Sequence, residues 1–371
     1  MKTAIVVAHN PQNAGMYSVD LGALHFFSGL GLPVDFFCPT VLNDAPTAGY
    51  GQMTLNHLKD SGDLAGYDNV IYWGDFTTNP QYGLYDFTQR AFQHDGLRDI
   101  NAAFQRWLDC FLPARLLNGP TRVFSFGQNF QTIWSIEKSL DLQVLAPLYN
   151  GFEAILPRDS FSVEHLTGYF PQAAQGKVQL GMDCAFLVNP NACPIRTNEG
   201  RTEPLRVGMC FGRSKLLNLD ILVAEARGRD VIVEDLSRWL SLPVRNVHWQ
   251  FAELLESVRR CDLIISDTYH LLINAMREGV AVQGVGVKVE RQEKSVSDFK
   301  KRTLFGDLGL PNFYLELDDK TVTKEQADLL LQALDPDIAA DRRARTAQNI
   351  SEKTEQYRAD LKEALFNGSV H

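Results

Sequence analysis

The stretch from Cys261 to Val282 constrains the fold of this chain more than any other, because it reads as strand, tight turn, helix and strand in succession. The branched apolar run at 263–265 is too short for a helix and is typical of a buried parallel strand. Residues 266–268 are turn and helix-capping types, apolar residues then recur at helical spacing, and Gly279 stands where a helix would end. The stretch therefore predicts a parallel α/β sheet.

The same stretch places His270 in the first turn of a helix, directly after a buried strand. Ligands of open α/β sheets bind at the carboxyl ends of the strands, and the start of a helix favours anions. His270 is thus a candidate site residue. The alternative is a half-buried histidine that bonds to a capping Asp267 or Thr268, and this stretch alone does not separate the two interpretations.

Composition excludes several classes of protein. The net charge is -9, which argues against a nucleic-acid-binding surface and against broad attraction to anionic lipid. The six cysteines are scattered and form no C-x-x-C pair, so neither a zinc site nor a disulfide framework is indicated. No apolar run has transmembrane length and no signal peptide is evident, so we expect a cytoplasmic protein, with peripheral association at the inner face of a membrane as an alternative.

Strands and helices alternate in both halves of the chain. Apolar runs at 3–8, 33–38, 70–73, 122–126 and 154–156 predict strands of a first domain, and runs at 205–211, 230–234, 263–265, 280–282 and 313–317 predict a second. An aperiodic stretch rich in proline and asparagine separates them. We expect residues 1–190 and 205–335 to be two doubly wound, Rossmann-like α/β domains facing each other across a cleft, with a linker at 191–204. Residues 336–371 should form a helix that packs back on the first domain.

Candidate binding residues gather where the predicted strands end. Each has a structural alternative: a βα connection for the loop around Asn13, an ion pair with Asp159 for Arg158, and a solvated helix face for the segment EKSVSDFKK that contains Lys294. No nucleophile elbow, H-E-x-x-H or Asp-x-Asp motif occurs, so we expect an anion-binding cleft without a metal or cofactor. The predicted substrate-binding residues are Asn13, Gly15, Gly74, Asp75, Gln128, Arg213, Thr268, Tyr269 and Lys288.

Three stretches resemble the polysaccharide pyruvyl transferase family. Residues 155–162 resemble its strand followed by Arg-Asp and a serine, residues 178–187 its Asp-x-Ala-Phe strand, and residues 261–282 its unit of strand, Arg-Leu-His, helix and Gly-Val-Pro-Val. The resemblance implies two domains similar to GT-B glycosyltransferases. It also implies transfer of the enolpyruvyl unit of phosphoenolpyruvate to hydroxyls of a surface polysaccharide, forming a cyclic ketal. One departure is Thr268-Tyr269-His270 in place of Arg-Leu-His: the histidine is kept, and the arginine that contacts the donor anion is not.

The resemblance also implies roles for individual residues. Arg158 would hold the donor's carboxylate or phosphate, His270 would act as general acid, and Lys294 or Lys288 would screen negative charge. The first domain would face the acceptor, a glycan or lipid-linked glycan, and the second would bind the donor. Two other functions stay open: a GT-B glycosyltransferase that uses a nucleotide sugar, and a non-catalytic sugar-binding relative. A homo-oligomer is compatible with each of them.

Overall fold

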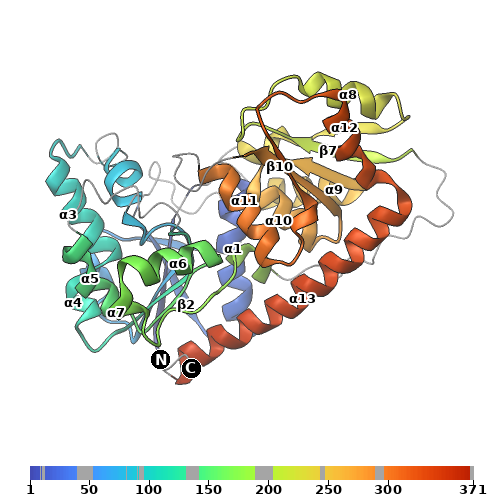
Figure 1. Ribbon diagram of the computed structural model, residues 1–371. Helices are drawn as coiled ribbons and strands as arrows, with labels where there is room; N and C mark the ends of the chain where they lie inside the picture. Colours follow the sequence, from blue (N-terminus) through green and yellow to red (C-terminus); the bar gives the residue numbers. More distant parts are fainter. Residues whose placement is uncertain are drawn as a thin grey trace. The chain divides into compact units, whose positions relative to one another are not determined.

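The computed structural model (Figure 1) describes residues 1–8, 10, 13–39, 53–80, 82–89, 91, 96–130, 142–188, 204–242, 247–288 and 296–367. The chain forms two compact units. Unit 1 contains Met1–Asn10, Val19–Val188 and Glu355–His371, and unit 2 contains Pro11–Ser18 and Asn189–Thr354. Within the described residues, none of the helices combines the length and the apolar character that crossing a lipid bilayer requires.

Unit 1 is built on a parallel sheet of six strands in the order β3-β2-β1-β4-β5-β6. The strands are β1 (Thr3–Val7), β2 (Val34–Cys38), β3 (Leu55–His57), β4 (Asn69–Asp75), β5 (Arg122–Gln128) and β6 (Ala154–Leu156). The central strands β1 and β4 are buried along their whole length, as expected for a sheet that helices cover on both faces. Every strand except β3 coincides with an apolar run from which a strand was predicted.

Helices, of which the longer ones bury aromatic side chains, connect the strands of unit 1. They are the amino-terminal α1 (Ala14–Gly29), which begins in unit 2, then α3 (Ile100–Phe111), α4 (Ala114–Leu117), α5 (Leu142–Asn150), α6 (Ser160–Tyr169) and α7 (Pro171–Ala174). The carboxylate of Asp99 caps α3 by accepting the N–H of Asn101 at 3.0 Å. Trp107 of α3 is fully buried and donates its indole N–H to the carbonyl of Thr77 at 2.9 Å, which anchors the loop after β4.

Unit 2 is built on a second parallel sheet, of five strands in the order β11-β10-β9-β7-β8. The strands are β7 (Arg206–Cys210), β8 (Ile232–Asp235), β9 (Leu263–Ser266), β10 (Ala281–Val287) and β11 (Tyr314–Leu317). β9, α10 (Tyr269–Arg277) and β10 are the strand, helix and strand predicted from residues 261–282, and Ala281–Gly284 pairs in parallel with Leu263–Ser266. The predicted α/β class is therefore confirmed.

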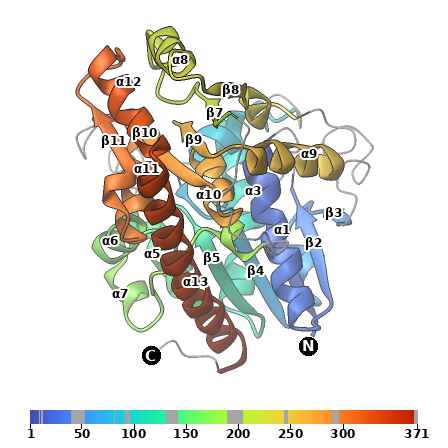
Figure 2. The same ribbon diagram turned by 90° about the vertical axis from the view of Figure 1, so that its right-hand side faces the viewer.

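Two sets of helices pack on the sheet of unit 2. Helix α10 packs against both α9 (Val247–Arg260) and α11 (Val296–Asp307), and α8 (Leu219–Arg227) and α12 (Lys324–Leu331) lie side by side (Figures 1 and 2). Leu263 and Ile265 of β9 join the buried residues that α8 and α12 cover. Both faces of β9 are buried, which is why its sequence is continuously apolar instead of alternating.

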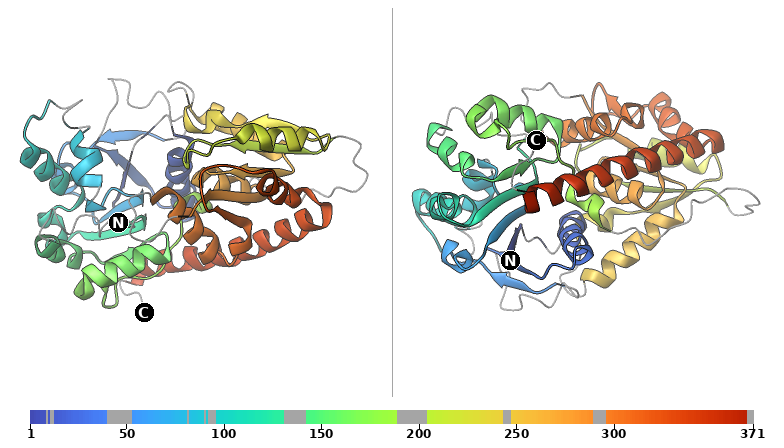
Figure 3. Two further views of the ribbon diagram at one scale, coloured as in Figure 1. Left: turned by 45° about the horizontal axis from the view of Figure 1, so that its top comes forward. Right: turned by 90° about the horizontal axis from the view of Figure 1, so that it is seen from below.

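The last helix, α13 (Pro336–Asn367), runs without a break (Figure 3). From Glu355 onward it belongs to unit 1, where Tyr357 is buried and its hydroxyl lies 3.7 Å from the thiol of Cys184. Arg122 of β5 donates to the backbone carbonyls of Ala364 and Leu365 at 2.9 and 2.7 Å. The linker predicted at 191–204 lies outside the described residues except for its last position, so the domain boundary stays a prediction.

Two local expectations differ from the structure. The stretch 178–187 is not a strand: only Val178 forms a bridge, to Ile155, and Cys184–Leu187 is a short 3₁₀ helix capped by the carboxylate of Asp183. Helix α1 begins at Ala14, within the stretch expected to be a loop around Asn13, because Asn13 caps it by accepting the N–H of Gly15 at 2.9 Å. Gly15 therefore lies in a helix and not in a loop.

Candidate functional site

The strand order of unit 2 defines a point where connections diverge. The chain runs from β7 to β8 on one side of β7, and it then crosses back so that β9 lies on the other side of β7. Ligands of doubly wound sheets bind outside the carboxyl ends of the strands at such a point. The segments that leave β7 and β9 there are Gly212–Ser214 and Asp267–His270, so two stretches distant in sequence meet at the expected position.

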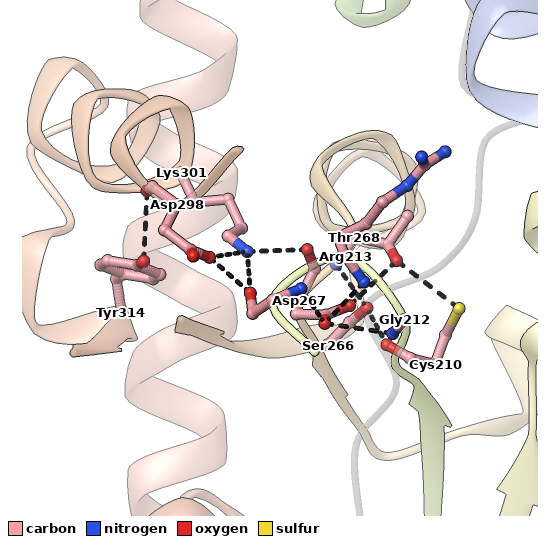
Figure 4. Close-up of polar contacts among 10 residues, drawn as sticks. Cys210, Gly212, Arg213, Ser266, Asp267, Thr268, Asp298, Lys301 and Tyr314 are labelled. Atoms are coloured by element: carbon pink, nitrogen blue, oxygen red, sulfur yellow. Dashed lines mark hydrogen bonds and ion pairs between the residues drawn. The ribbon is translucent and has the colours of Figure 1, made fainter. Parts of the chain in front are cut away.

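The carboxylate of Asp267 holds the segment after β7. Its Oδ2 accepts the backbone N–H groups of Gly212, Arg213 and Ser214 at 3.1, 2.9 and 2.7 Å (Figure 4). Successive N–H groups that converge in this way form a site for an anion, and here the anion is a carboxylate of the protein itself. Asp267 is fully buried, so these three donors fix the loop and are not available to a substrate.

Thr268 does not cap α10 with its side chain as the sequence suggested. Its hydroxyl lies 3.3 Å from Asp267 Oδ1 and 3.6 Å from the thiol of Cys210, and its own N–H is bound by the hydroxyl of Ser266 at 2.9 Å. Burial raises the pKa of the Cys210 thiol to about 11, so the sulfur stays protonated near neutral pH. Thr268 is only 5% exposed and contributes to the packing of the strand ends.

His270 lies against the first turn of α1. A Cβ atom built on Gly15 would come within 2.5 Å of His270 Nδ1 and within 2.6 Å of its Cβ and Cγ, so a residue with any side chain would collide with the imidazole. The ring also contacts Tyr269 edge to face, with centroids 5.2 Å apart. His270 is half-buried, and Gly15 is the residue that makes room for it.

Hydrogen bonds join the amino-terminal halves of α1 and α10 within unit 2. The amide of Asn274 donates to the carbonyl of His270 at 2.7 Å and to the hydroxyl of Ser18 at 3.1 Å. That hydroxyl in turn donates to the carbonyl of Gly15 at 2.6 Å. All of these groups are buried or nearly so, and the chain of bonds fixes the backbone at His270 relative to both helices. The sequence placed Gly15 and His270 in different domains, and the structure brings them together in one.

Two of the predicted cationic residues lie exposed at the carboxyl edge of this sheet. Arg213 follows β7, and among the described residues its guanidinium has no hydrogen bond or ion pair; Figure 4 draws it pointing away from the polar cluster. Lys288 follows β10. Tyr269 is 9% exposed, with the ammonium of Lys300 6.0 Å from its ring centroid. Lys294 lies outside the described residues.

Sequence reasoning missed Lys301, which lies in the segment expected to be an exposed helix face. The side chain is fully buried and donates to Asp298 Oδ1, the carbonyl of Asp267 and the hydroxyl of Ser214 at 2.7, 2.8 and 2.9 Å (Figure 4). Burial lowers the pKa of Lys301, although Asp298 acts in the opposite direction. Asp298 also accepts a hydrogen bond from the hydroxyl of Ser214. The spacing of an acid and a lysine three residues apart was the available signal, but it is equally common on exposed helices.

Gly74 and Asp75 lie at the corresponding point of unit 1, where β1 separates β2 from β4. Both have left-handed backbone conformations, with φ angles of 65° and 57°. A Cβ on Gly74 would lie 2.1 Å from a methyl carbon of Val19, so the turn needs glycine for space as well as for conformation. The Asp75 side chain is buried at the carboxyl end of β4.

Gln128 is fully buried, and its amide serves the fold of unit 1. Its Oε1 accepts the N–H of Thr78 at 3.1 Å, and its Nε2 donates to the hydroxyl of Thr77 at 2.9 Å. The side chain thus connects the end of β5 to the loop after β4. Satisfying both ends of a buried amide internally is typical of a structural residue.

Arg158 forms the ion pair that the sequence left as an alternative. The guanidinium lies 3.6 Å from a carboxylate oxygen of Asp159 and 3.3 Å from one of Asp183, and the arginine side chain is 2% exposed. Asp159 also caps α6 by accepting the N–H of Ser162 at 2.7 Å. These contacts connect the end of β6 to the segment before Cys184–Leu187, and a role in binding the donor stays a prediction. The described residues contain no group of three or more His, Cys, Asp or Glu that could hold a metal ion.

A comparison with protein families places the chain in one of them. The sequence model of the family "Polysaccharide pyruvyl transferase" matches residues 64–287, which is more than half of the chain and includes β9, α10 and β10. The chain belongs to this family. Thr268, which the sequence resemblance places where the family has an arginine, is buried. A search of curated proteins found no match.

Solved structures support the fold that the family implies. This member of the family resembles HepE (Alr3699) of Anabaena in complex with UDP and glucose, with 13% identity over 98% of this chain and 100% of the other, and a TM-score of 0.51. It also resembles UGT2 of Phytolacca americana, with 9% identity over 99% of this chain and 100% of the other and a TM-score of 0.54. A third similar structure is a putative UDP-N-acetylglucosamine 2-epimerase of Listeria monocytogenes, with 10% identity over 98% of this chain and 95% of the other and a TM-score of 0.53. The predicted GT-B-like fold of two α/β domains is therefore confirmed, while their arrangement across a cleft stays a prediction.

Proposed function

We propose that this chain transfers a pyruvyl group from phosphoenolpyruvate to two hydroxyls of a glycan, forming a cyclic ketal in the synthesis of a surface polysaccharide. Membership of the polysaccharide pyruvyl transferase family supports this proposal. The observation that carries it is the convergence of His270, Gly15 and Arg213 at the carboxyl edge of β7 and β9 in unit 2. The reaction would take place in the cytoplasm, in keeping with the buried free thiols of the described cysteines.

Arg213 is the residue that best fits the task of binding the anionic donor. It follows β7 next to the start of α10, is exposed, and has its backbone N–H fixed by Asp267. A guanidinium can hold a carboxylate or a phosphate through two parallel hydrogen bonds. Arg158 has less support for this role because its guanidinium is buried between the carboxylates of Asp159 and Asp183. Lys288, exposed at the end of β10, would add positive charge at the same edge.

His270 would handle the proton of the reaction. Two acceptor hydroxyls add to C2 of phosphoenolpyruvate and its C2–O bond to phosphate breaks. One hydroxyl proton ends on the methylene carbon, which becomes the methyl group of the ketal, and the other leaves with inorganic phosphate. A general acid that delivers the first proton contributes about 10²–10⁴-fold to the rate. The packing of the imidazole against Gly15, and the bond from Asn274 to the backbone carbonyl of His270, support a fixed position for this acid.

The acceptor side is proposed for unit 1, at Gly74 and Asp75. These residues lie at the carboxyl end of β4 where the strand order of that sheet reverses, which is where a doubly wound sheet binds its ligand. Asn13 and Gly15 were expected to face the acceptor as well. Because they belong to unit 2, with Asn13 capping α1 and Gly15 in contact with His270, we assign them to the donor side.

The two other functions predict different ligands. A glycosyltransferase of the same fold would bind a nucleotide sugar and would release no inorganic phosphate from phosphoenolpyruvate. A non-catalytic relative would bind glycans without turning over either donor, and the loss of the family arginine at Thr268 is the feature that would fit it. Each is an outcome of the experiment below.

A thermal-shift panel of phosphoenolpyruvate against common nucleotide sugars tests the proposal. A ligand that binds only the folded state raises the free energy of unfolding, by about 2.7 kcal/mol at a concentration 100 times its Kd, and the melting temperature rises with it. We expect a shift with phosphoenolpyruvate that is lost in Arg213→Ala and kept in Arg227→Ala. Arg227 is a matched control because it is also an exposed arginine of unit 2 but lies at the end of α8, which precedes the amino end of β8. A shift with nucleotide sugars alone would refute the proposal.

A further inference from the structure

A buried polar cluster lies directly beneath the proposed donor site of unit 2. It consists of Lys301 and Asp298 of α11, Ser214 after β7 and Asp267 after β9 (Figure 4). None of the four side chains is more than 4% exposed. The cluster therefore connects three separate elements at the edge of the sheet where the proposed ligand binds.

Lys301 donates one hydrogen bond to each of the three elements, namely α11, the segment after β7 and the segment after β9. Its ammonium has three N–H groups, and they donate to Asp298, to the hydroxyl of Ser214 and to the backbone carbonyl of Asp267. All of its hydrogen-bonding capacity is thus used inside the protein. Lys301 is therefore not a residue that could contact a substrate, and its position must matter in another way.

Arg213 is held by this cluster from both sides. Its backbone N–H donates to Asp267, and the next residue, Ser214, bonds to Asp267 through its N–H and to Asp298 and Lys301 through its hydroxyl. Asp267 also begins the segment that leads into α10 and His270. One cluster thereby fixes the backbone of both residues that the proposed reaction uses.

The sheet is shaped to admit the carboxylate of Asp298. A Cβ on Gly286 of β10 would lie 2.5 Å from Asp298 Oδ1 and 2.2 Å from the hydroxyl of Tyr314. That hydroxyl donates to the backbone carbonyl of Asp298 at 3.2 Å. A buried ion pair is weak evidence for stability, because desolvation offsets the attraction and apolar replacements often do as well. Such a pair is better explained by the need to fix a geometry.

We propose that Lys301 and Asp298 are positioning residues that hold the Gly212–Ser214 loop, and with it Arg213, in the orientation that binds the anionic donor. The inference rests on the proposed function for its ligand, although its structural part can be tested without any ligand. Because neither residue touches the donor, their effect is expected on donor affinity through Arg213 and not on affinity for the acceptor.

Two variants and one control separate positioning from general stability. Ser214→Ala removes only the hydroxyl through which Lys301 and Asp298 reach the loop. The double variant Asp298→Asn with Lys301→Met removes both charges at nearly constant size. Arg277→Met is the matched control: it also removes a buried cation paired with a carboxylate, Glu278, but at the opposite end of α10, and it leaves that carboxylate with Arg259.

The measurements are amide hydrogen exchange of residues 212–214 and the affinity for phosphoenolpyruvate. We expect faster exchange at 212–214 and a donor Kd raised about tenfold or more in Ser214→Ala and in the double variant, with both quantities unchanged in Arg277→Met. The KM for the acceptor should not change in any of them.

Two results would overturn the inference: wild-type exchange at 212–214 in folded Ser214→Ala, or faster exchange there with an unchanged donor Kd. If the double variant fails to fold, Ser214→Ala decides alone. If the wild-type protein binds no phosphoenolpyruvate, the proposed function fails instead, and the exchange rates still decide whether the cluster holds the loop.

Discussion

Gly15→Ala is the substitution that tests the site geometry most sharply. It adds one methyl group in the first turn of α1, where a Cβ would lie 2.5–2.6 Å from three atoms of the His270 side chain. Carbon atoms in ordinary contact are about 3.5 Å apart, so the imidazole or the helix must move by about 1 Å. Two of the three atoms are His270 Cβ and Cγ, which cannot move away without moving α10 or changing the rotamer.

The expected effects on stability and on activity differ greatly in size. Overpacking costs about 1–3 kcal/mol, and replacing glycine by alanine within a helix recovers about 1 kcal/mol, so the free energy of unfolding should fall by only about 0–2 kcal/mol. A displacement of about 1 Å of a reacting group can lower a rate about 100-fold. Gly15→Ala should therefore give a folded protein with severely reduced turnover.

The control is Gly29→Ala, in the last turn of the same helix, where a Cβ would meet nothing within 4 Å. Melting temperature and the rate of pyruvyl transfer are measured on the same samples of both variants. Gly29→Ala should match the wild type in turnover and should melt at the same or a slightly higher temperature, because alanine recovers up to about 1 kcal/mol there without any clash. Near-native turnover in Gly15→Ala would refute the reasoning, because it would mean that the imidazole can move freely or takes no part in the reaction.

Four further outcomes are expected. His270→Asn should keep the fold and donor affinity but lower kcat by about 10²–10⁴-fold; a lower melting temperature with normal kcat would instead identify a core histidine. Arg158→Ala should lower the free energy of unfolding by about 3–5 kcal/mol in a urea titration, because it leaves Asp183 buried without its cation; little loss of stability with loss of donor binding would restore Arg158 to the donor site. Activity should survive EDTA, whereas loss of turnover that Mg²⁺ or Mn²⁺ restores would favour a metal-dependent glycosyltransferase. Stability should fall above about pH 10, because burial keeps the pKa of Tyr357 well above its usual value in the folded chain while the unfolded chain releases that proton. Tyr357→Phe should make this fall smaller. Urea titrations at about pH 8 and about pH 10.5 that give the same loss of unfolding free energy in the wild type and in Tyr357→Phe would contradict this.

The architecture could be predicted from the sequence because parallel strands buried on both faces leave a continuous apolar run. This signal placed β9 and β10 on either side of α10, and it found all but one strand of unit 1. The exception, β3 (Leu55–His57), has three residues of which two are exposed, so no apolar run marks it. Periodicity also gave the long carboxyl-terminal helix.

The composition of the site was harder to predict, because it depends on contacts between distant segments. Gly15 looked like a loop glycine, since no local pattern reveals that His270 packs against it. Lys301 looked like a solvated lysine, since its partners Ser214 and Asp267 are far away in sequence. Arg158 was given a donor-binding role from a motif, although its buried partners favour a structural one. In each case the tertiary environment, and not the local sequence, determines what the side chain can do.

The release of inorganic phosphate from phosphoenolpyruvate in the presence of a glycan acceptor tests the central claim most directly. The account predicts phosphate release that requires the acceptor, matches the pyruvyl ketal formed one for one, and is lost in Arg213→Ala and His270→Asn. Transfer of sugar from a nucleotide sugar with no phosphate released from phosphoenolpyruvate would contradict it, as would glycan binding without turnover of either donor.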